Sequence, residues 1–230
     1  NPKASLRYQM SDELVLRGSY STSFREPSLS QLSSSLVSLQ GLQDFNTDGT
    51  TRGSVSFIRV AVAKNENLTP EESDNMNFGA IWTPNDQTSV TLDYWTVDYK
   101  NVVTLESAQG KIIANPDSTD IIRTNGTLVG VTTSYFNAAS IDASGFDLEA
   151  TYSFDTPLGQ ASIGLNTARM LEYKIPDVAG GTKDVVGLFN HDNFARSMPE
   201  TKSVITGMLS NGNHNFAAFI RNVSEYETTR

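Results

Sequence analysis

One short stretch of the sequence has the residue types and spacing of a metal-binding loop. Asp44, Asn46 and Asp48 alternate and Gly49 follows, which matches the D-x-N-x-D-G start of a calcium loop. In such loops alternate oxygens converge on the ion, and the glycine permits a sharp turn. The second half does not match, because Val55 stands where a bidentate glutamate is expected. A polar loop without metal is the simpler interpretation, so Asp44, Asn46 and Asp48 form only a weak calcium candidate.

A second group of polar side chains lies on segments in which apolar and polar residues alternate. Successive side chains of a strand point to opposite faces, so each of these segments has one apolar face and one polar face. The polar faces could contact a ligand or another part of the protein. A wall of solvated or mutually paired charges would explain them as well. The candidate residues are Arg17, Asn75, Asn77, Asp147 and Glu149.

No group of residues in the sequence predicts catalysis. His191 and His214 have no acidic or histidine partner at ligand spacing, which argues against a metal site and against a general base. The serine run at 33–35 lacks the glycines of a nucleophile elbow. We therefore expect no enzyme and no cofactor.

Composition restricts the class of protein further. The chain has 230 residues, a net charge of -9 and no cysteine. No cluster of Lys and Arg could neutralise a row of phosphates, so nucleic acid is not an expected partner. The lack of cysteine excludes a disulfide framework, and no window of about 20 residues is apolar enough for a spanning helix.

The alternation itself predicts about eight strands in four hairpins. The sharpest case is 146–154, where Phe, Leu, Ala, Tyr and Phe alternate with Asp, Glu, Thr and Ser. Tight turns join the strands of each hairpin, and residues with turn chemistry such as Pro, Asn, Asp and Gly occupy them. The turns are expected at 11–12, 83–86, 155–159 and 210–213. The strands are expected at 3–10, 13–24, 75–82, 90–99, 146–154, from 161 onward, 201–209 and 214–223.

Three long polar stretches connect one hairpin to the next. They lie at about 25–73, 103–139 and 175–199. The second stretch is expected to contain a short helix from Ser107 to Ala114, ended by Asn115-Pro116, and a strand at 127–136.

The alternation changes phase at Trp95. Either a β-bulge or the end of a bilayer-facing zone would explain the change.

Tight turns at one end of a sheet and long loops at the other are typical of outer-membrane barrels. Each spanning strand needs only about 10 residues of alternating character, so a barrel can cross a bilayer without a strongly apolar segment. We therefore predict an all-β fold, an antiparallel transmembrane β-barrel segment of about eight strands. Its tight turns would be periplasmic and its long loops extracellular.

Several segments resemble the β-barrel domain of TonB-dependent outer-membrane receptors. The resemblance covers about residues 1 to 226 and is most specific where a strand leads into Phe24-Arg25-Glu26-Pro27 and a long loop then reaches Leu68-Thr69-Pro70-Glu71-Glu72-Ser73. Two further matching pieces are Leu92-Asp93-Tyr94-Trp95 and Gly145-Phe146-Asp147-Leu148-Glu149.

The resemblance implies a barrel of about 22 strands filled by an amino-terminal plug that engages TonB. This sequence corresponds to a late portion of such a receptor and shows no plug. We therefore expect residues 1–230 to be a fragment of the barrel domain. The implied partners are outer-membrane lipid, the receptor's own plug and the TonB complex through the rest of the chain, and a small-molecule or oligosaccharide ligand. The implied location is the outer membrane of a Gram-negative bacterium.

The function that follows is TonB-energised uptake of a bulky nutrient such as a siderophore, cobalamin or an oligosaccharide. The scarcity of Lys and Arg in the loops slightly favours neutral ligands such as carbohydrates. Two alternatives remain open from the sequence. A passive or structural outer-membrane barrel complete in eight strands would pair the strand from His214 with the strand from Lys3. A soluble β-sandwich carbohydrate-binding module would instead pack its apolar faces together.

Overall fold

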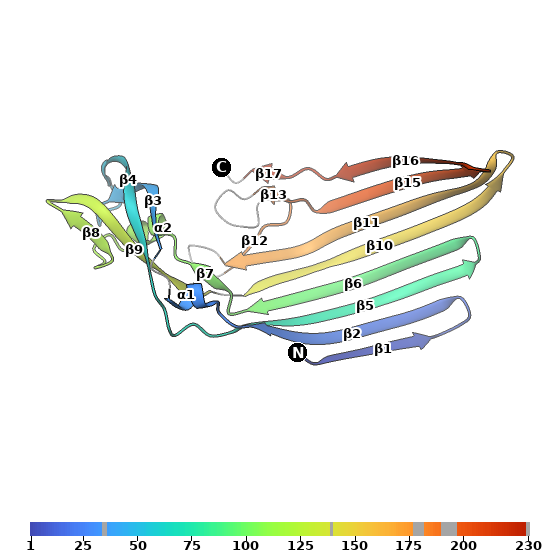
Figure 1. Cartoon of the computed structure of the whole chain (residues 1–230), viewed down its shortest axis with the longest axis horizontal. Coiled ribbons are helices and arrows are strands. Elements are labelled where there is room, and N and C mark those ends of the chain that lie inside the picture. Colours follow the sequence, from blue (N-terminus) through green and yellow to red (C-terminus); the bar gives the residue numbers. More distant parts are fainter. Residues whose placement is uncertain (34–35, 139, 177–181, 190–196, 229–230) are drawn as a thin grey trace.

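A computed structural model describes residues 1–33, 36–138, 140–176, 182–189 and 197–228. Its main feature is a long antiparallel sheet in which strands that follow one another along the sheet also follow one another in sequence (Figure 1). All eight predicted strands belong to it. They are β1 (Lys3–Gln9), β2 (Leu14–Arg25), β5 (Glu71–Asn85), β6 (Thr88–Lys100), β10 (Ile141–Thr156), β11 (Gly159–Pro176), β15 (Thr201–Asn211) and β16 (His214–Val223).

The register of this sheet separates apolar from polar side chains. Directly paired residues lie on the same face, and one row across the sheet consists of Tyr8, Leu16, Ala80, Leu92 and Leu148. The row beside it, displaced by one residue in each strand, is polar and lies on the opposite face. The alternation seen in the sequence therefore produces an apolar face and a polar face that are separated most clearly from β1 to β10. Beyond β10 the same row continues through the polar residues Thr167 and Ser203.

Neither alternative architecture fits this arrangement. Within the described residues β1 pairs only with β2 and β16 pairs only with β15, so the sheet is open and the eight-stranded closed barrel is wrong. A β-sandwich would bury its apolar face, yet Leu6 is 73% exposed, Phe78 59% and Phe216 61%.

Three turns of the main sheet are shorter than predicted, and in the one expected at 210–213 strand β15 reaches Asn211 before β16 starts at His214. Strand β5 continues through Thr83 and Pro84 to Asn85. Its register with β6 shifts between Trp82 and Asn85, and this shift accommodates the proline. The turn expected at 155–159 likewise shortens, because β10 reaches Thr156 and β11 starts at Gly159.

The phase change at Trp95 does not come from a bulge. Strand β6 keeps one register with β5 from Val90 to Lys100 and one register with β10 from Thr88 to Tyr99, so no shift occurs at Trp95. Trp95, Val97 and Tyr99 therefore lie on the same face as Asp93, which leaves the end of the apolar zone as the surviving explanation. A register shift does occur in the next ladder, between Ser144 and Gly145 of β10.

The long stretches at 25–73 and 103–139 contain more structure than the sequence predicts. The first holds α1 (Leu29–Ser33), β3 (Val37–Phe45) and β4 (Thr51–Ala63). The second holds β7 (Val103–Leu105), α2 (Ala108–Ala114), β8 (Ile121–Thr124) and β9 (Thr127–Asn137), so the predicted short helix and the predicted strand are both confirmed. Ser107 caps the start of α2 by accepting a hydrogen bond from Gly110 N, and Asn115 forms its C-cap.

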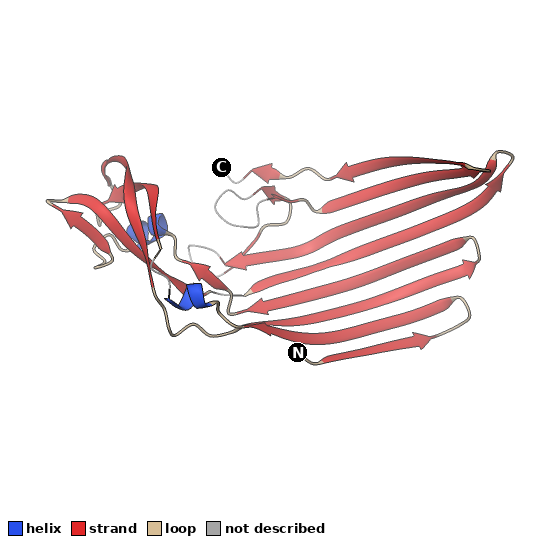
Figure 2. Cartoon of the chain, in the orientation of Figure 1, coloured by secondary structure: helices blue, strands red, loops and turns tan. Residues whose placement is uncertain are grey.

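Strands β3, β4, β7, β8 and β9 and helix α2 form a second body beyond the loop end of the main sheet, which we call the loop module (Figure 2). Strand β4 from the first stretch pairs in parallel with β9 from the second. The loop module has its own hydrophobic core, with Ile112 of α2 fully buried. The other buried members of this core are Leu42, Ile58, Val60, Ala108, Ile121, Leu128 and Val131.

The remaining elements are short. Strand β12 (Thr182–Asp184) extends β11, and β13 (Leu188–Phe189) joins β14 (Ser197–Met198) and β17 (Glu227–Thr228) in a small third sheet. His191 lies outside the described residues.

Neither α1 nor α2, the helices of the described residues, is long and apolar enough to cross a membrane.

Candidate functional site

The register of the main sheet places all five polar candidates on one face. Arg17 of β2 is paired with Gly79 of β5, which is paired with Asp93 of β6, and Asp93 is paired with Asp147 of β10. Asn77 and Asn75 precede Gly79 by two and four residues, and Glu149 follows Asp147 by two, so alternation keeps them on that face. We call this surface the polar face.

An ion pair crosses the middle of the polar face. Arg17 donates from Nε to Asp93 Oδ1 at 3.0 Å, and its Nη2 contacts the other carboxylate oxygen. The two residues belong to strands on either side of β5, and Gly79 lies between them. A Cβ at Gly79 would overlap the Asp93 carboxylate and come within 2.8 Å of Arg17 Nε. The glycine is therefore what allows the two side chains to meet.

The two predicted carboxylates on β10 are arranged differently. Asp147 and Glu149 are exposed and, within the described residues, neither forms an ion pair. Asp147 lies directly opposite Asp93, and two like charges in this position repel each other unless a cation is near. Arg17 supplies that cation for Asp93. Asp147 and Glu149 keep their charges available to solvent or to a cationic group.

A buried carboxylate fixes the loop end of the polar face. Glu71, at the start of β5, is 1% exposed and accepts a hydrogen bond from Val103 N at 2.8 Å. Its other oxygen accepts from Arg25 Nε at the end of β2. Glu71 thus connects the sheet to the second long stretch at the start of β7. We did not identify Glu71 or Asp93 as site residues from the sequence, although both lie in the segments that carry the family resemblance.

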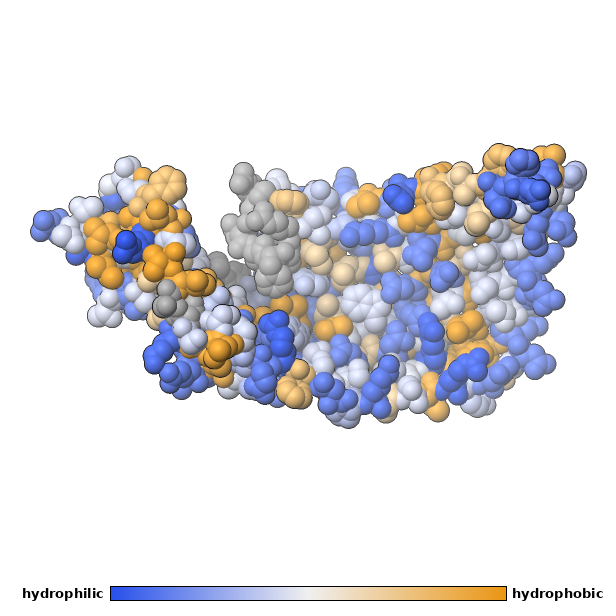
Figure 3. Space-filling view, in the orientation of Figure 1, coloured by the Kyte–Doolittle hydropathy of each residue, from blue (hydrophilic) through white to orange (hydrophobic). Residues whose placement is uncertain are grey.

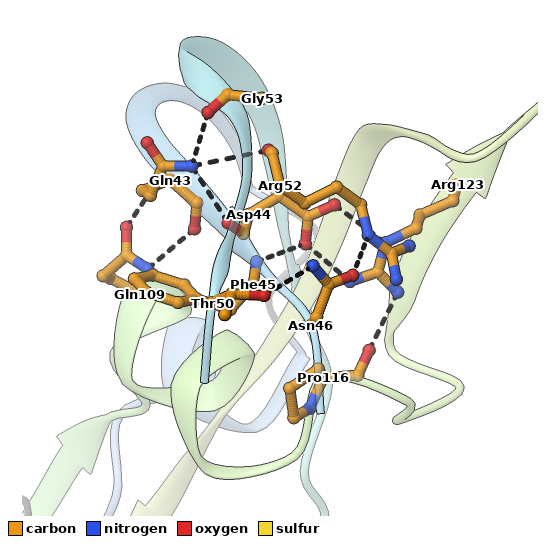
Figure 4. A network of polar contacts seen from close by, with 10 residues as sticks. All are labelled: Gln43, Asp44, Phe45, Asn46, Thr50, Arg52, Gly53, Gln109, Pro116 and Arg123. Atoms are coloured by element: carbon orange, nitrogen blue, oxygen red, sulfur yellow. Dashed lines mark hydrogen bonds and ion pairs between the residues drawn. The ribbon is translucent and has the colours of Figure 1, made fainter. Parts of the chain in front are cut away.

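The three calcium candidates lie in the hairpin formed by β3 and β4, and Figure 4 shows two of them, Asp44 and Asn46. Asn46 Oδ1 accepts from Arg52 Nε at 2.8 Å, and Asp48 Oδ1 accepts from Thr50 N at 2.9 Å. Gly49 has a φ of 81°, which a tight turn requires and which favours glycine. The hairpin therefore explains the spacing of these residues without a metal ion. Within the described residues no three His, Cys, Asp or Glu side chains are grouped so that they could hold one.

Asp44, the first calcium candidate, instead forms a bidentate ion pair. Arg123 of β8 donates to its two carboxylate oxygens at 2.9 and 2.6 Å, and both side chains are largely buried. The hydrogen bonds from Arg123 lower the pKa of Asp44, burial opposes them, and the Phe45 N–H lowers it further. This pair links the two long stretches. Figure 4 shows a second link, in which Gln43 and Gln109 bond each other reciprocally through backbone and side-chain groups.

The comparison with known families settles what kind of barrel this is. The family model described as TonB dependent receptor-like, beta-barrel matches residues 1–204. The chain belongs to the TonB-dependent receptor β-barrel family. No curated protein sequence matches it.

Solved structures of TonB-dependent receptors share the fold of this barrel segment. The ferric enterobactin receptor PfeA of Pseudomonas aeruginosa, crystallised with enterobactin, has a TM-score of 0.64 at 16% identity, over 97% of this chain and 28% of that one. The siderophore receptor PirA of Acinetobacter baumannii gives 0.59 at 15% identity, over 98% and 30%. The copper transporter OprC gives 0.53 at 12% identity, over 96% and 25%. This segment of a TonB-dependent receptor barrel therefore spans less than a third of the length of these proteins.

Membership of the family fixes several further points. TonB-dependent receptors are transporters rather than enzymes, and they are proteins of the outer membrane of Gram-negative bacteria. The segment is accordingly a piece of an antiparallel transmembrane β-barrel, with its short turns on the periplasmic side and the loop module outside the cell.

Proposed function

We propose that this TonB-dependent receptor segment belongs to a transporter that takes up a bulky nutrient with energy supplied through TonB. The nutrient would be a siderophore, cobalamin or an oligosaccharide. The observation that carries the proposal is the separation of the two faces of one open sheet, within a chain of this family. Lipid would cover the apolar face, because a membrane barrel must satisfy its backbone internally and present apolar side chains to acyl chains.

The polar face would line the lumen of the complete barrel. Asp147 and Glu149 are exposed there and would be available to cationic groups of the plug or of a passing solute. The Arg17–Asp93 pair and the Glu71 contacts would keep the wall rigid. The remaining strands and the plug would come from the rest of the receptor, of which residues 1–230 form a part.

The loop module would receive the nutrient on the outside. PfeA was crystallised with enterobactin, and OprC is a copper transporter, so related barrels serve different cargo.

A transport assay of the complete receptor tests the proposal. Cells that express it would be given a labelled ferric siderophore, cobalamin or an oligosaccharide, with TonB present or deleted. We expect accumulation of one class that is lost without TonB. Equal entry with and without TonB would indicate a passive pore and contradict the proposal.

A further inference from the structure

Four short chain segments, which we call the crossings, join the loop module to the main sheet. Figure 3 shows the module projecting beyond one end of the sheet. Within the described residues no strand of the module pairs with a strand of the main sheet. The chain enters the module after β2 and after β6, and it returns to the sheet before β5 and before β10. Four crossings without bonds between them could act as hinges, because a hinge is a short segment that absorbs changes in backbone angles.

Glu71 bonds three of the four crossings to one another. It begins β5, in the crossing that returns from the first long stretch. One carboxylate oxygen accepts from Arg25 Nε at the end of β2. The other accepts from Val103 N, 2.8 Å away, in the crossing that leaves β6. Because Glu71 is only 1% exposed, water cannot replace these donors while the junction stays closed. Rotation of the module would therefore remove the partners of a buried carboxylate.

Asn137 bonds the fourth crossing to two of the others. It ends β9, where the second long stretch returns to β10. Its Oδ1 accepts from Thr69 N at 2.9 Å, and its Nδ2 donates to Thr69 O at 2.9 Å and to Asn101 O at 2.7 Å. Beside it, Ala138 N donates to Val102 O at 2.7 Å. An asparagine suits this place, because its amide both accepts and donates hydrogen bonds.

We propose that Glu71 and Asn137 hold the loop module in one orientation on the main sheet. Together their side chains reach all four crossings, so no crossing can bend alone without breaking at least one of these hydrogen bonds. The module would then be a fixed extension of the sheet and not a hinged lid. The inference goes beyond the proposed function, because it concerns the motion of the module and holds for any nutrient.

Distances between spin labels in the complete receptor test the inference. One label is placed at Thr22→Cys on β2 and the other at Ile113→Cys, an exposed position of α2. Pulsed dipolar spectroscopy then gives the distribution of distances between sheet and module. A second pair, Ser54→Cys with Ile113→Cys, lies within the module and reports whether the module itself stays folded. Any cysteine in the rest of the receptor is first replaced by serine.

Two junction variants and two matched controls carry these labels. Glu71→Gln keeps the shape of the side chain and removes its charge, whereas Asn137→Ala removes three hydrogen bonds. Glu72→Gln is the control for the first, since Glu72 is adjacent and exposed and forms no ion pair in the part of the chain that the structure describes. Asn46→Ala is the control for the second, since the Asn46 amide bonds only within the hairpin of β3 and β4.

We expect the wild type and both controls to give one narrow distance between sheet and module. Each junction variant should widen that distribution at least about twofold, because released crossings can rotate. The distance within the module should stay unchanged. A wide or two-peaked distribution in the wild type would overturn the inference, even if neither junction variant folds. Narrow distributions in both junction variants, or controls that widen as much as they do, would overturn it as well. The measurement needs neither nutrient nor TonB, so its result is independent of the uptake function.

Discussion

A glycine in the middle strand allows two charged side chains from the strands on either side to form an ion pair. Gly79 separates Arg17 from Asp93, and the two meet over it. Their exposure is unequal, because the Asp93 side chain is 12% exposed and that of Arg17 is 43%. Removing Arg17 would leave a largely covered carboxylate without a partner, whereas removing Asp93 would leave a cation that water can reach. Loss of the ion pair therefore costs more free energy when Asp93 is the residue left without a partner than when Arg17 is.

Adding one methyl group at Gly79 tests this geometry. In Gly79→Ala the new Cβ overlaps the Asp93 carboxylate and separates it from Arg17, so we expect a loss of about 1–3 kcal/mol of stability. The matched control is Gly207→Ala in β15, where a new Cβ would meet nothing within 4 Å. Thermal unfolding of the complete receptor measures both. An equal midpoint for the two variants would contradict the role assigned to Gly79.

The Asp44–Arg123 pair predicts an acid response of the loop module. Arg123 lowers the pKa of Asp44 in the folded state, so the pair stabilises the module above the unfolded pKa of about 3.9. That stabilisation is lost as the pH falls through the lowered pKa. Hydrogen exchange in β3 and β4, corrected for intrinsic rates, should show less protection at pH 3 than at pH 6.

Two variants make the acid test specific. Asp44→Asn should already be less protected at pH 6 and should lose most of the pH dependence. Asp48→Asn, in the same hairpin, changes an exposed carboxylate whose pKa is lowered only by hydrogen bonds within its own turn, so it should keep most of the protection at pH 6 and most of the pH dependence. Wild-type protection that is equal at both pH values would refute the assignment.

At the scale of elements, the eight strands of the main sheet were predictable because the residues of each face are of one kind, apolar on one face and polar on the other. Alternation over about ten residues then marks both the strand and its orientation. Strands β3 and β4 were not predicted, because their side opposite the module core also carries apolar residues, among them Leu39 and Phe57. The two faces therefore do not differ in the way that the alternation pattern requires. The sequence predicted which residues form the polar face. It did not predict the ion pair on that face, since the approach of Arg17 to Asp93 depends on the register of three strands.

The two long stretches should fold as one unit. Ile112 of α2, in the second stretch, is fully buried in a core that it shares with residues of β3 and β4 from the first, whereas its neighbour Ile113 is 58% exposed. Ile112→Ala should cost about 2–5 kcal/mol within the module and increase hydrogen exchange in β4, which lies in the other stretch. Ile113→Ala should leave β4 unchanged. If Ile112→Ala affects only the second stretch, the two fold independently.

At the scale of the whole molecule, the two faces of the sheet require different surroundings. A sheet that is apolar on one side and open at both edges would aggregate in water, because exposed apolar surface and unpaired edge strands both invite association. The proposed place in a transmembrane barrel would resolve this, since lipid would meet the apolar face and further strands of a complete receptor would meet β1 and β16.

Adjacent residues of β10 offer the sharpest test of which medium covers each face. Leu148 and Glu149 are neighbours in sequence and lie on opposite faces, and residues 1–230 contain no cysteine. Any cysteine in the rest of the receptor would be replaced by serine before labelling. A spin label at Leu148→Cys in the complete receptor, reconstituted in bilayers, should be accessible to oxygen and protected from a polar nickel reagent. The label at Glu149→Cys should be shielded from oxygen in lipid. Leu16→Cys on β2 should behave like Leu148→Cys, because register places Leu16, Leu92 and Leu148 in one row. Polar-reagent access at both leucine positions would mean that lipid does not cover this face, and the membrane placement of the sheet would have to be abandoned.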